Sequence, residues 1–171
     1  MDEVDTVFFR ARKGKIHSWL IGLFTYSTQH KNQYSHVEIQ VSPRICLGSD
    51  EADGGVRAKE GIDTHNGCWD RLTVPVPNLA AGMDFFRGTD GAGYDFARIG
   101  MAITKPFRKL FHYGKSRIFK DNKKKWICNE WAYAFLVACG CELPPVDEVS
   151  NPNEFYDIVR AYILKQSQVN P

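Results

Sequence analysis

The first half of the chain alternates apolar and polar positions, a pattern typical of β-strands that bury one face. Residues 34–41 show it best, because positions 37, 39 and 41 are aliphatic whereas positions 36, 38 and 40 carry His, Glu and Gln. The same alternation predicts strands over 4–10, 45–49, 56–60 and 69–76. Turn residues at Pro43-Arg44 and at positions 53–55 separate these strands, and Pro75 indicates the edge of a sheet.

Apolar residues at helical spacing mark most of the second half and one early segment. We expect helices over 15–26, 78–87, 94–103 and 150–166, the last opened by the capping sequence Ser150-Asn151-Pro152. The apolar run from Cys128 to Cys139 predicts a buried helix that ends at Gly140. Loops are expected at 27–33 and 112–125. These elements predict one α+β domain over residues 1–171, with a small, mostly antiparallel sheet from residues 34–76 and helices packed on it.

Composition limits the classes of function. The chain is 43% hydrophobic and 25% charged, as soluble globular proteins are, and its net charge of +2 argues against a dedicated nucleic-acid-binding protein. Its apolar stretches are too short for a transmembrane segment, and its acidic start does not resemble a secretory signal. Five cysteines, an odd number without framework spacing, suit a reducing compartment. We therefore expect a cytoplasmic protein.

Cys128 is the candidate nucleophile. It stands in the first turn of a predicted helix, just after three lysines at 123–125, and both the helix dipole and these charges favour a thiolate. Such a thiolate needs a base within hydrogen-bond reach, and His36 on the polar face of its strand is the best candidate. Glu38 shares that face and could orient the imidazole; Ser49 and Glu51 are alternatives for this third role.

The other cysteines and histidines are interpreted as structural or surface residues. His65 and Cys68 could in principle join Cys139 and Cys141 around zinc, but their spacing is not that of paired zinc knuckles. The glycine-rich stretch 88–93 lacks the following Lys-Ser/Thr of a phosphate-binding loop. The sequence therefore predicts neither a metal nor a cofactor.

Four segments together carry a resemblance to a known family. They are Tyr34-Ser-His-Val-Glu-Ile39, the hairpin from Ile45 to Lys59, the run Gly93-Tyr-Asp-Phe96, and Trp126-Ile-Cys-Asn-Glu-Trp131. In this order, over about residues 4–160, the chain resembles the permuted branch of the NlpC-type papain-like cysteine hydrolases, in particular YiiX-like bacterial and phage proteins. The resemblance implies a circularly permuted papain-like fold with the catalytic cysteine at a helix N-terminus.

The same resemblance implies a thiol-dependent hydrolase or transferase. Cys128 would attack a carbonyl carbon and His36 would take and return the proton. A peptide, a peptidoglycan peptide or a lipid ester would be the substrate. Relatives often place an orienting acid on the strand after the histidine strand, where this chain has Gly48 and Ser49. That departure motivates the main alternative, a catalytically inactive binding module of the same fold; a lipid acyltransferase or thioesterase is a further alternative.

Overall fold

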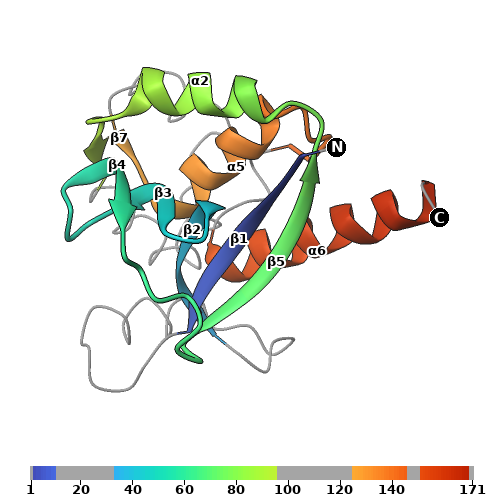
Figure 1. Ribbon diagram of the computed structural model, residues 1–171, viewed down its shortest axis with the longest axis horizontal. Helices are drawn as coiled ribbons and strands as arrows, with labels where there is room; N and C mark the ends of the chain where they lie inside the picture. Colours follow the sequence, from blue (N-terminus) through green and yellow to red (C-terminus); the bar gives the residue numbers. More distant parts are fainter. Residues whose placement is uncertain (1, 11–32, 96–124, 146–150, 170–171) are drawn as a thin grey trace, which may run out of the picture.

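The computed structural model describes residues 2–10, 33–95, 125–145 and 151–169 (Figure 1). Its elements along the chain are β1 (Asp2–Arg10), β2 (Tyr34–Ser42), β3 (Ile45–Asp50), β4 (Gly55–Glu60), β5 (Trp69–Val76), α2 (Leu79–Thr89), β6 (Gly93–Tyr94), β7 (Lys125–Trp126), α5 (Cys128–Ala138) and α6 (Pro152–Val169). The helix predicted over 15–26 lies outside the described residues, as do almost all of both predicted loops.

In the described part of the chain, one sheet of seven strands, in the order β5-β1-β2-β3-β4-β6-β7, forms the centre of the fold. Neighbouring strands are antiparallel except for the short parallel pair of β6 and β7. The α+β class and the mostly antiparallel sheet agree with the sequence prediction. The predicted extent of the sheet was too small, because β1 lies inside it between β5 and β2 and the sheet continues to β7.

A second correction concerns the predicted helix over 94–103. Tyr94 belongs to strand β6, and its neighbour Gly93 pairs with both Gly55 and Lys125. Strand β6 therefore lies between β4 and β7, and its pairing with β7 attaches the segment just before Cys128 to the sheet. Residues 96–103 lie outside the described part of the chain.

The turn and edge predictions are confirmed. The turn at Pro43-Arg44 joins β2 and β3 as an antiparallel hairpin. Strand β5, which contains Pro75, is an edge strand that pairs with β1 along its length. Because proline lacks an N–H group, it is tolerated where a strand has only one partner.

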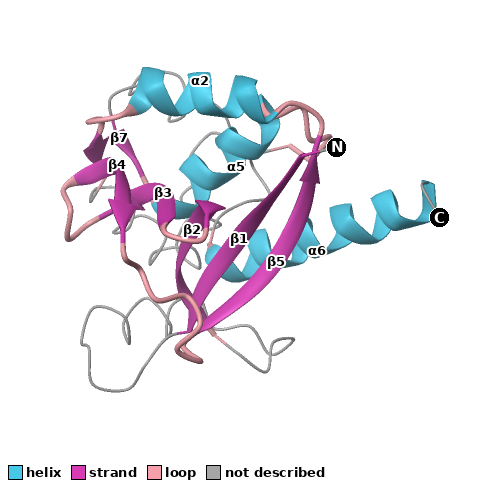
Figure 2. Cartoon of the chain, in the orientation of Figure 1, coloured by secondary structure: helices cyan, strands magenta, loops and turns pink. Residues whose placement is uncertain are grey.

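The helices bury the apolar face of the sheet. Helix α5 packs on β2 and β3, α6 packs on β5 and β2, and α2 lies on α5 (Figure 2). Trp131 and Phe135 of α5 are fully buried in the resulting core together with Phe8 and Phe155. None of the described helices is both long and apolar enough to cross a membrane.

Two local contacts explain how the helices are placed. A Cβ on Gly82 of α2 would lie 2.2 Å from the sulfur of Cys139, so glycine permits the close approach of α2 to the end of α5. At the start of α6, the side chain of Asn151 accepts hydrogen bonds from the amides of Asn153 and Glu154, at 2.9 and 3.1 Å. Asn151 is thus the N-cap and Pro152 the first helical residue, as the sequence predicts.

Candidate functional site

Cys128 is the first residue of α5. The preceding Ile127 is extended and its apolar side chain cannot cap the helix, whose first backbone hydrogen bond runs from the amide of Trp131 to the carbonyl of Ile127. The N-terminal amides of a helix attract negative charge, whether on sulfur or on an oxygen bound nearby. The Cys128 residue is 5% exposed.

His36 lies beside this sulfur. The residue stands near the start of β2, and its ring is close enough to the thiol of Cys128 for the two groups to interact electrostatically. Burial alone would lower the pKa of His36, but the charge and hydrogen bond of Cys128, followed by those of Glu38, raise it well above its ordinary value. The structure therefore brings the two residues together, and the surroundings of His36 favour an imidazolium next to sulfur.

Glu38 completes a line of three side chains. Its Oε1 lies 2.7 Å from Nε2 of His36, while the Glu38 side chain is only 1% exposed and the His36 side chain 18%. Because a ring nitrogen carries a single proton, a bond from Nε2 to Glu38 leaves Nδ1 for the thiol. The order is sulfur, imidazole, carboxylate, the arrangement in which a third group orients a base.

Arg57 on β4 is a member of the site that sequence reasoning missed. Its Nη1 donates to Glu38 Oε2 and its Nη2 to Glu38 Oε1, both at 2.7 Å. Burial would raise the pKa of Glu38, but the hydrogen bonds and charges of His36 and Arg57 outweigh burial and lower it. Glu38 is therefore a buried carboxylate that stays ionised.

Two acidic residues around the β3–β4 turn hold the guanidinium in turn. Arg57 donates from Nε to Asp53 at 2.7 Å and from Nη2 to Asp50 at 3.3 Å. The Asp50 carboxylate also lies 3.8 Å from Nε2 of His36, farther than that of Glu38. A charged network thus surrounds the imidazole on the side away from sulfur.

The alternatives for the third group have different surroundings. Ser49 donates its hydroxyl to the backbone carbonyl of Trp126 at 2.8 Å, which ties β7, two residues before the thiol, to strand β3. Glu51 lies in the turn after β3, where its carbonyl accepts a bond from the amide of Gly54. The carboxylate that contacts His36 at hydrogen-bond distance is that of Glu38.

The site also contains the one cluster of possible metal ligands in the described part of the chain. Donor atoms of His36, Glu38 and Asp50 lie within 4.8 Å of one another. However, Arg57 binds both oxygens of Glu38 and one of Asp50, so a cation there would face a fixed positive charge. The donor set fits a hydrogen-bonded network better than a metal centre.

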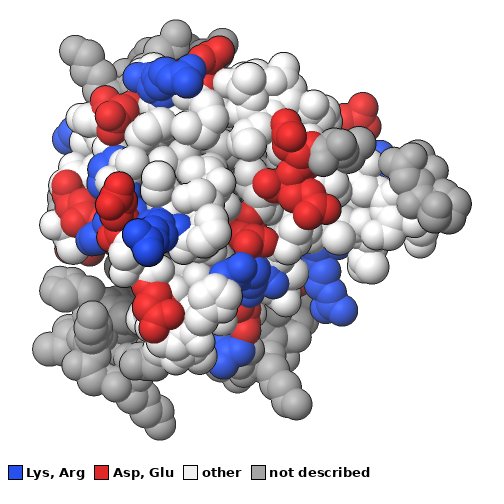
Figure 3. Space-filling model, viewed as in Figure 1, with Lys and Arg blue, Asp and Glu red and all other residues white. Residues whose placement is uncertain are grey.

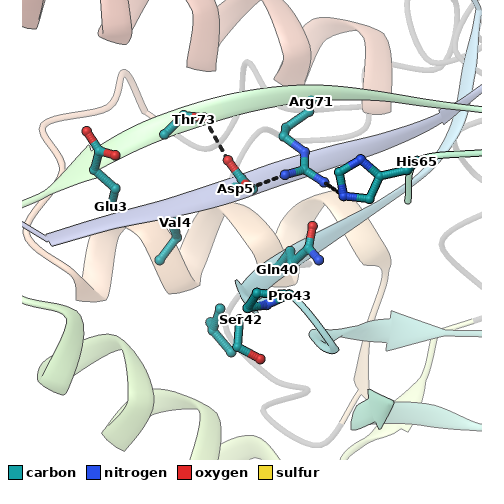
Figure 4. Close-up of a pocket in the computed structure, with 10 residues that line it drawn as sticks. Glu3, Val4, Asp5, Gln40, Ser42, Pro43, His65, Arg71 and Thr73 are labelled. Carbon is teal, nitrogen blue, oxygen red and sulfur yellow. Dashed lines mark hydrogen bonds and ion pairs between the residues drawn. The ribbon is translucent and has the colours of Figure 1, made fainter. Parts of the chain in front are cut away.

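A groove of about 390 Å³ lies toward the other end of β2 (Figure 4). It is lined by Glu3, Val4, Asp5, Gln40, Val41, Ser42, Pro43, His65, Arg71 and Thr73. Arg71 binds Asp5 at 2.8 Å and contacts the ring of His65 at 3.0 Å, so the partner of His65 in this groove is an arginine. The groove contains none of the three candidate catalytic residues, so it does not mark the candidate active site.

Charges of both signs are interspersed on the face of the molecule shown in Figure 3, and basic side chains do not form a continuous patch there.

Comparison with known proteins adds no assignment: no protein-family model matches the chain, and the search of curated proteins finds no match. The geometry of Cys128, His36 and Glu38 is therefore what indicates the chemistry of this site.

Proposed function

We propose that this protein is a cysteine hydrolase with a circularly permuted papain-like fold. The observation that carries the proposal is a row of three side chains: the thiol of Cys128 lies close enough to the ring of His36 to raise its pKa, and that ring is bonded to the buried carboxylate of Glu38. A nucleophile, a base and a group that orients the base are the parts that acyl transfer through a thiol requires.

Acylation would begin from the thiolate–imidazolium pair. The sulfur of Cys128 attacks the carbonyl carbon of an amide or ester, and a tetrahedral intermediate forms with negative charge on oxygen. The amide N–H of Cys128, at the uncapped start of α5, supports that charge. As the intermediate collapses, His36 gives its proton to the leaving amine or alcohol, and a thioester on Cys128 remains.

Deacylation reverses these roles. The now neutral His36 takes a proton from water, the resulting hydroxide attacks the thioester, and the acid is released as the sulfur leaves as thiolate. Glu38 stabilises the imidazolium at both ends of the cycle because its oxygen lies 2.7 Å from Nε2. A different acceptor in place of water would make the same site an acyltransferase.

The permuted papain-like assignment rests on chain order and on the elements that carry the residues. The base comes first on a strand, and the nucleophile follows at the first residue of a helix that packs on that strand and its neighbour. That arrangement supports the resemblance to the permuted NlpC-type hydrolases. Peptides, peptidoglycan peptides and lipid esters remain the substrate classes that the proposal includes.

The interaction between Cys128 and His36 can be tested through the reactivity of the thiol before any substrate is known. Iodoacetamide alkylation of Cys128 is followed over time by mass spectrometry of its peptide, because a thiol with a neighbouring base should react faster than one without it. His36→Ala should slow alkylation at pH 6 by at least about tenfold, whereas the matched variant His65→Ala should not. Equal alkylation rates of Cys128 in the unaltered protein and in His36→Ala would overturn the proposal.

A second assay separates the enzyme from an inactive binding module. The protein is mixed with peptidoglycan peptides, with a peptide amide and with a p-nitrophenyl ester, and intact mass is recorded. An enzyme should give a thioester adduct on Cys128 or a released product, both absent in Cys128→Ala. If alkylation of Cys128 depends on His36 but none of the three substrates gives a product or an adduct, the inactive binding module is favoured.

A further inference from the structure

Hydrogen bonds from two residues set the orientation of the buried carboxylate of Glu38. It accepts three hydrogen bonds at 2.7 Å, one from His36 and two from the fork of Arg57. A bidentate guanidinium fixes the plane of a carboxylate, since both N–H groups must point at the two oxygens. The plane that satisfies Arg57 is also the plane in which Oε1 faces the imidazole.

Arg57 reaches Glu38 across an intervening strand. Glu38 is on β2 and Arg57 on β4, and β3 lies between them in the sheet. The residue of β3 directly opposite Arg57 is Gly48. A Cβ at Gly48 would lie 2.3 Å from Glu38 Oε2 and 3.3 Å from Arg57 Nη1, so the ion pair occupies the space that any side chain there would need. Two strand spacings are about 10 Å, a span that the side chains of Arg57 and Glu38 cover together.

The guanidinium is itself anchored. Asp53 binds its Nε and Asp50 binds Nη2, and the Arg57 side chain is only 14% exposed. Lysine could supply the charge at this position but not the two parallel bonds together with the third to Asp53. The network therefore requires an arginine at position 57 and a glycine at position 48, as well as the carboxylate of Glu38.

We propose that Arg57 is the positioning residue of the site: reaching over Gly48, it holds the carboxylate of Glu38 turned toward His36. This inference rests on the proposed cysteine chemistry. It assigns to Arg57 and Gly48 roles that act only through Glu38, and neither residue contacts the reacting atoms.

The two ways in which Arg57 could influence His36 predict opposite signs. If Arg57 were only a nearby positive charge, its removal would stabilise the imidazolium and raise the pKa of His36. If Arg57 holds the carboxylate, its removal leaves Glu38 buried without a counter-charge, the carboxylate takes up a proton or turns away, and the pKa of His36 falls. An NMR titration of the His36 ring, assigned with His36→Gln, distinguishes the two signs without a substrate.

We expect Arg57→Gln to lower the pKa of His36 by about one unit or more, the scale of losing a neighbouring carboxylate. Gly48→Ala, which keeps every charged group, should lower it in the same direction, and Arg57→Lys should give a smaller fall. Arg71→Gln is the matched control, because Arg71 also pairs with a carboxylate on this sheet but lines the groove that contains neither His36 nor Glu38. That variant should leave the titration of His36 unchanged.

A double-variant comparison tests whether Arg57 acts through Glu38. In a Glu38→Gln background, Arg57→Gln should produce no further fall; an equal fall in both backgrounds would overturn the proposal. A rise or no change in the His36 pKa on Arg57→Gln would also overturn it, and Arg57→Lys and Gly48→Ala decide if that variant does not fold. If His36 of the unaltered protein titrates near 6.5, the proposed function itself fails; a raised value with no response to Arg57 refutes only the positioning role.

Discussion

Replacing Glu38 by glutamine should destabilise the fold as well as the site. The change keeps the size of the side chain and removes its charge. Glu38 accepts three hydrogen bonds, from His36 and from both arms of Arg57. A glutamine has only one acceptor oxygen, and its amide nitrogen would face a donor of Arg57 or of His36. At least one of the three bonds is lost, and Arg57 is left half-satisfied in a largely buried position.

The magnitude follows from that loss. Removing one partner of a buried ion pair costs about 3–5 kcal/mol, and the retained amide oxygen puts glutamine at the lower end, about 3 kcal/mol. For a chain of this length, 1 kcal/mol corresponds to about 2–4 °C, so the midpoint of thermal unfolding should fall by about 6–12 °C at pH 7. Asp5→Asn is the control. Its pair with Arg71 is partly exposed, and such pairs contribute about 1 kcal/mol or less.

The pH dependence gives a second, independent check. The folded state lowers the pKa of Glu38, so its contribution to stability is present above the unfolded value of about 4.3 and is lost as pH falls through the folded value. Urea unfolding of both proteins from pH 7 to pH 3 should therefore show a gap that narrows below about pH 4.3. The reasoning is refuted if Glu38→Gln costs no more than Asp5→Asn, or if the gap persists unchanged in acid.

Three further predictions concern the packing and the site. Gly82→Ala should destabilise the protein by about 1–3 kcal/mol in urea unfolding because its Cβ would meet a sulfur at 2.2 Å, whereas Gly88→Ala on the same helix meets open space and should be neutral or stabilising. Asn151→Ala should cost about 1 kcal/mol through loss of the α6 cap, measured in the same way. Ser49→Ala should also cost about 1 kcal/mol but leave the NMR titration of His36 unchanged, and a shift there would instead favour a catalytic role for the hydroxyl.

The long strands and helices in the described part of the chain were predicted well because their apolar residues recur at a regular spacing. Strand β5 begins and ends where the alternation over 69–76 does, and α5 begins at the residue where the apolar run starts. The two-residue strands β6 and β7 have no period at all, so Tyr94 was assigned to a helix. The central position of β1 could not be predicted either, since strand order depends on pairing between segments far apart in the chain.

The site was predicted only where local pattern determines it. Glu38 shares a strand face with His36, and alternation alone puts the two side chains near each other. Arg57 looked like one more charged strand residue, because its partner lies two strands away and its alignment with Gly48 follows from the register of β3 and β4. A glycine flanked by strand residues was the available signal, since such positions often mark the close approach of another group.

The base, its carboxylate and the arginine all fall within the contiguous hairpins of residues 34–60, while the sulfur is supplied much later in the chain. During synthesis these strands leave the ribosome well before the nucleophile does. On the proposed chemistry, a nascent or truncated chain would be harmless to cellular esters and amides until α5 docks. Reactivity would then appear only after α5 has been synthesised and has packed on β2 and β3.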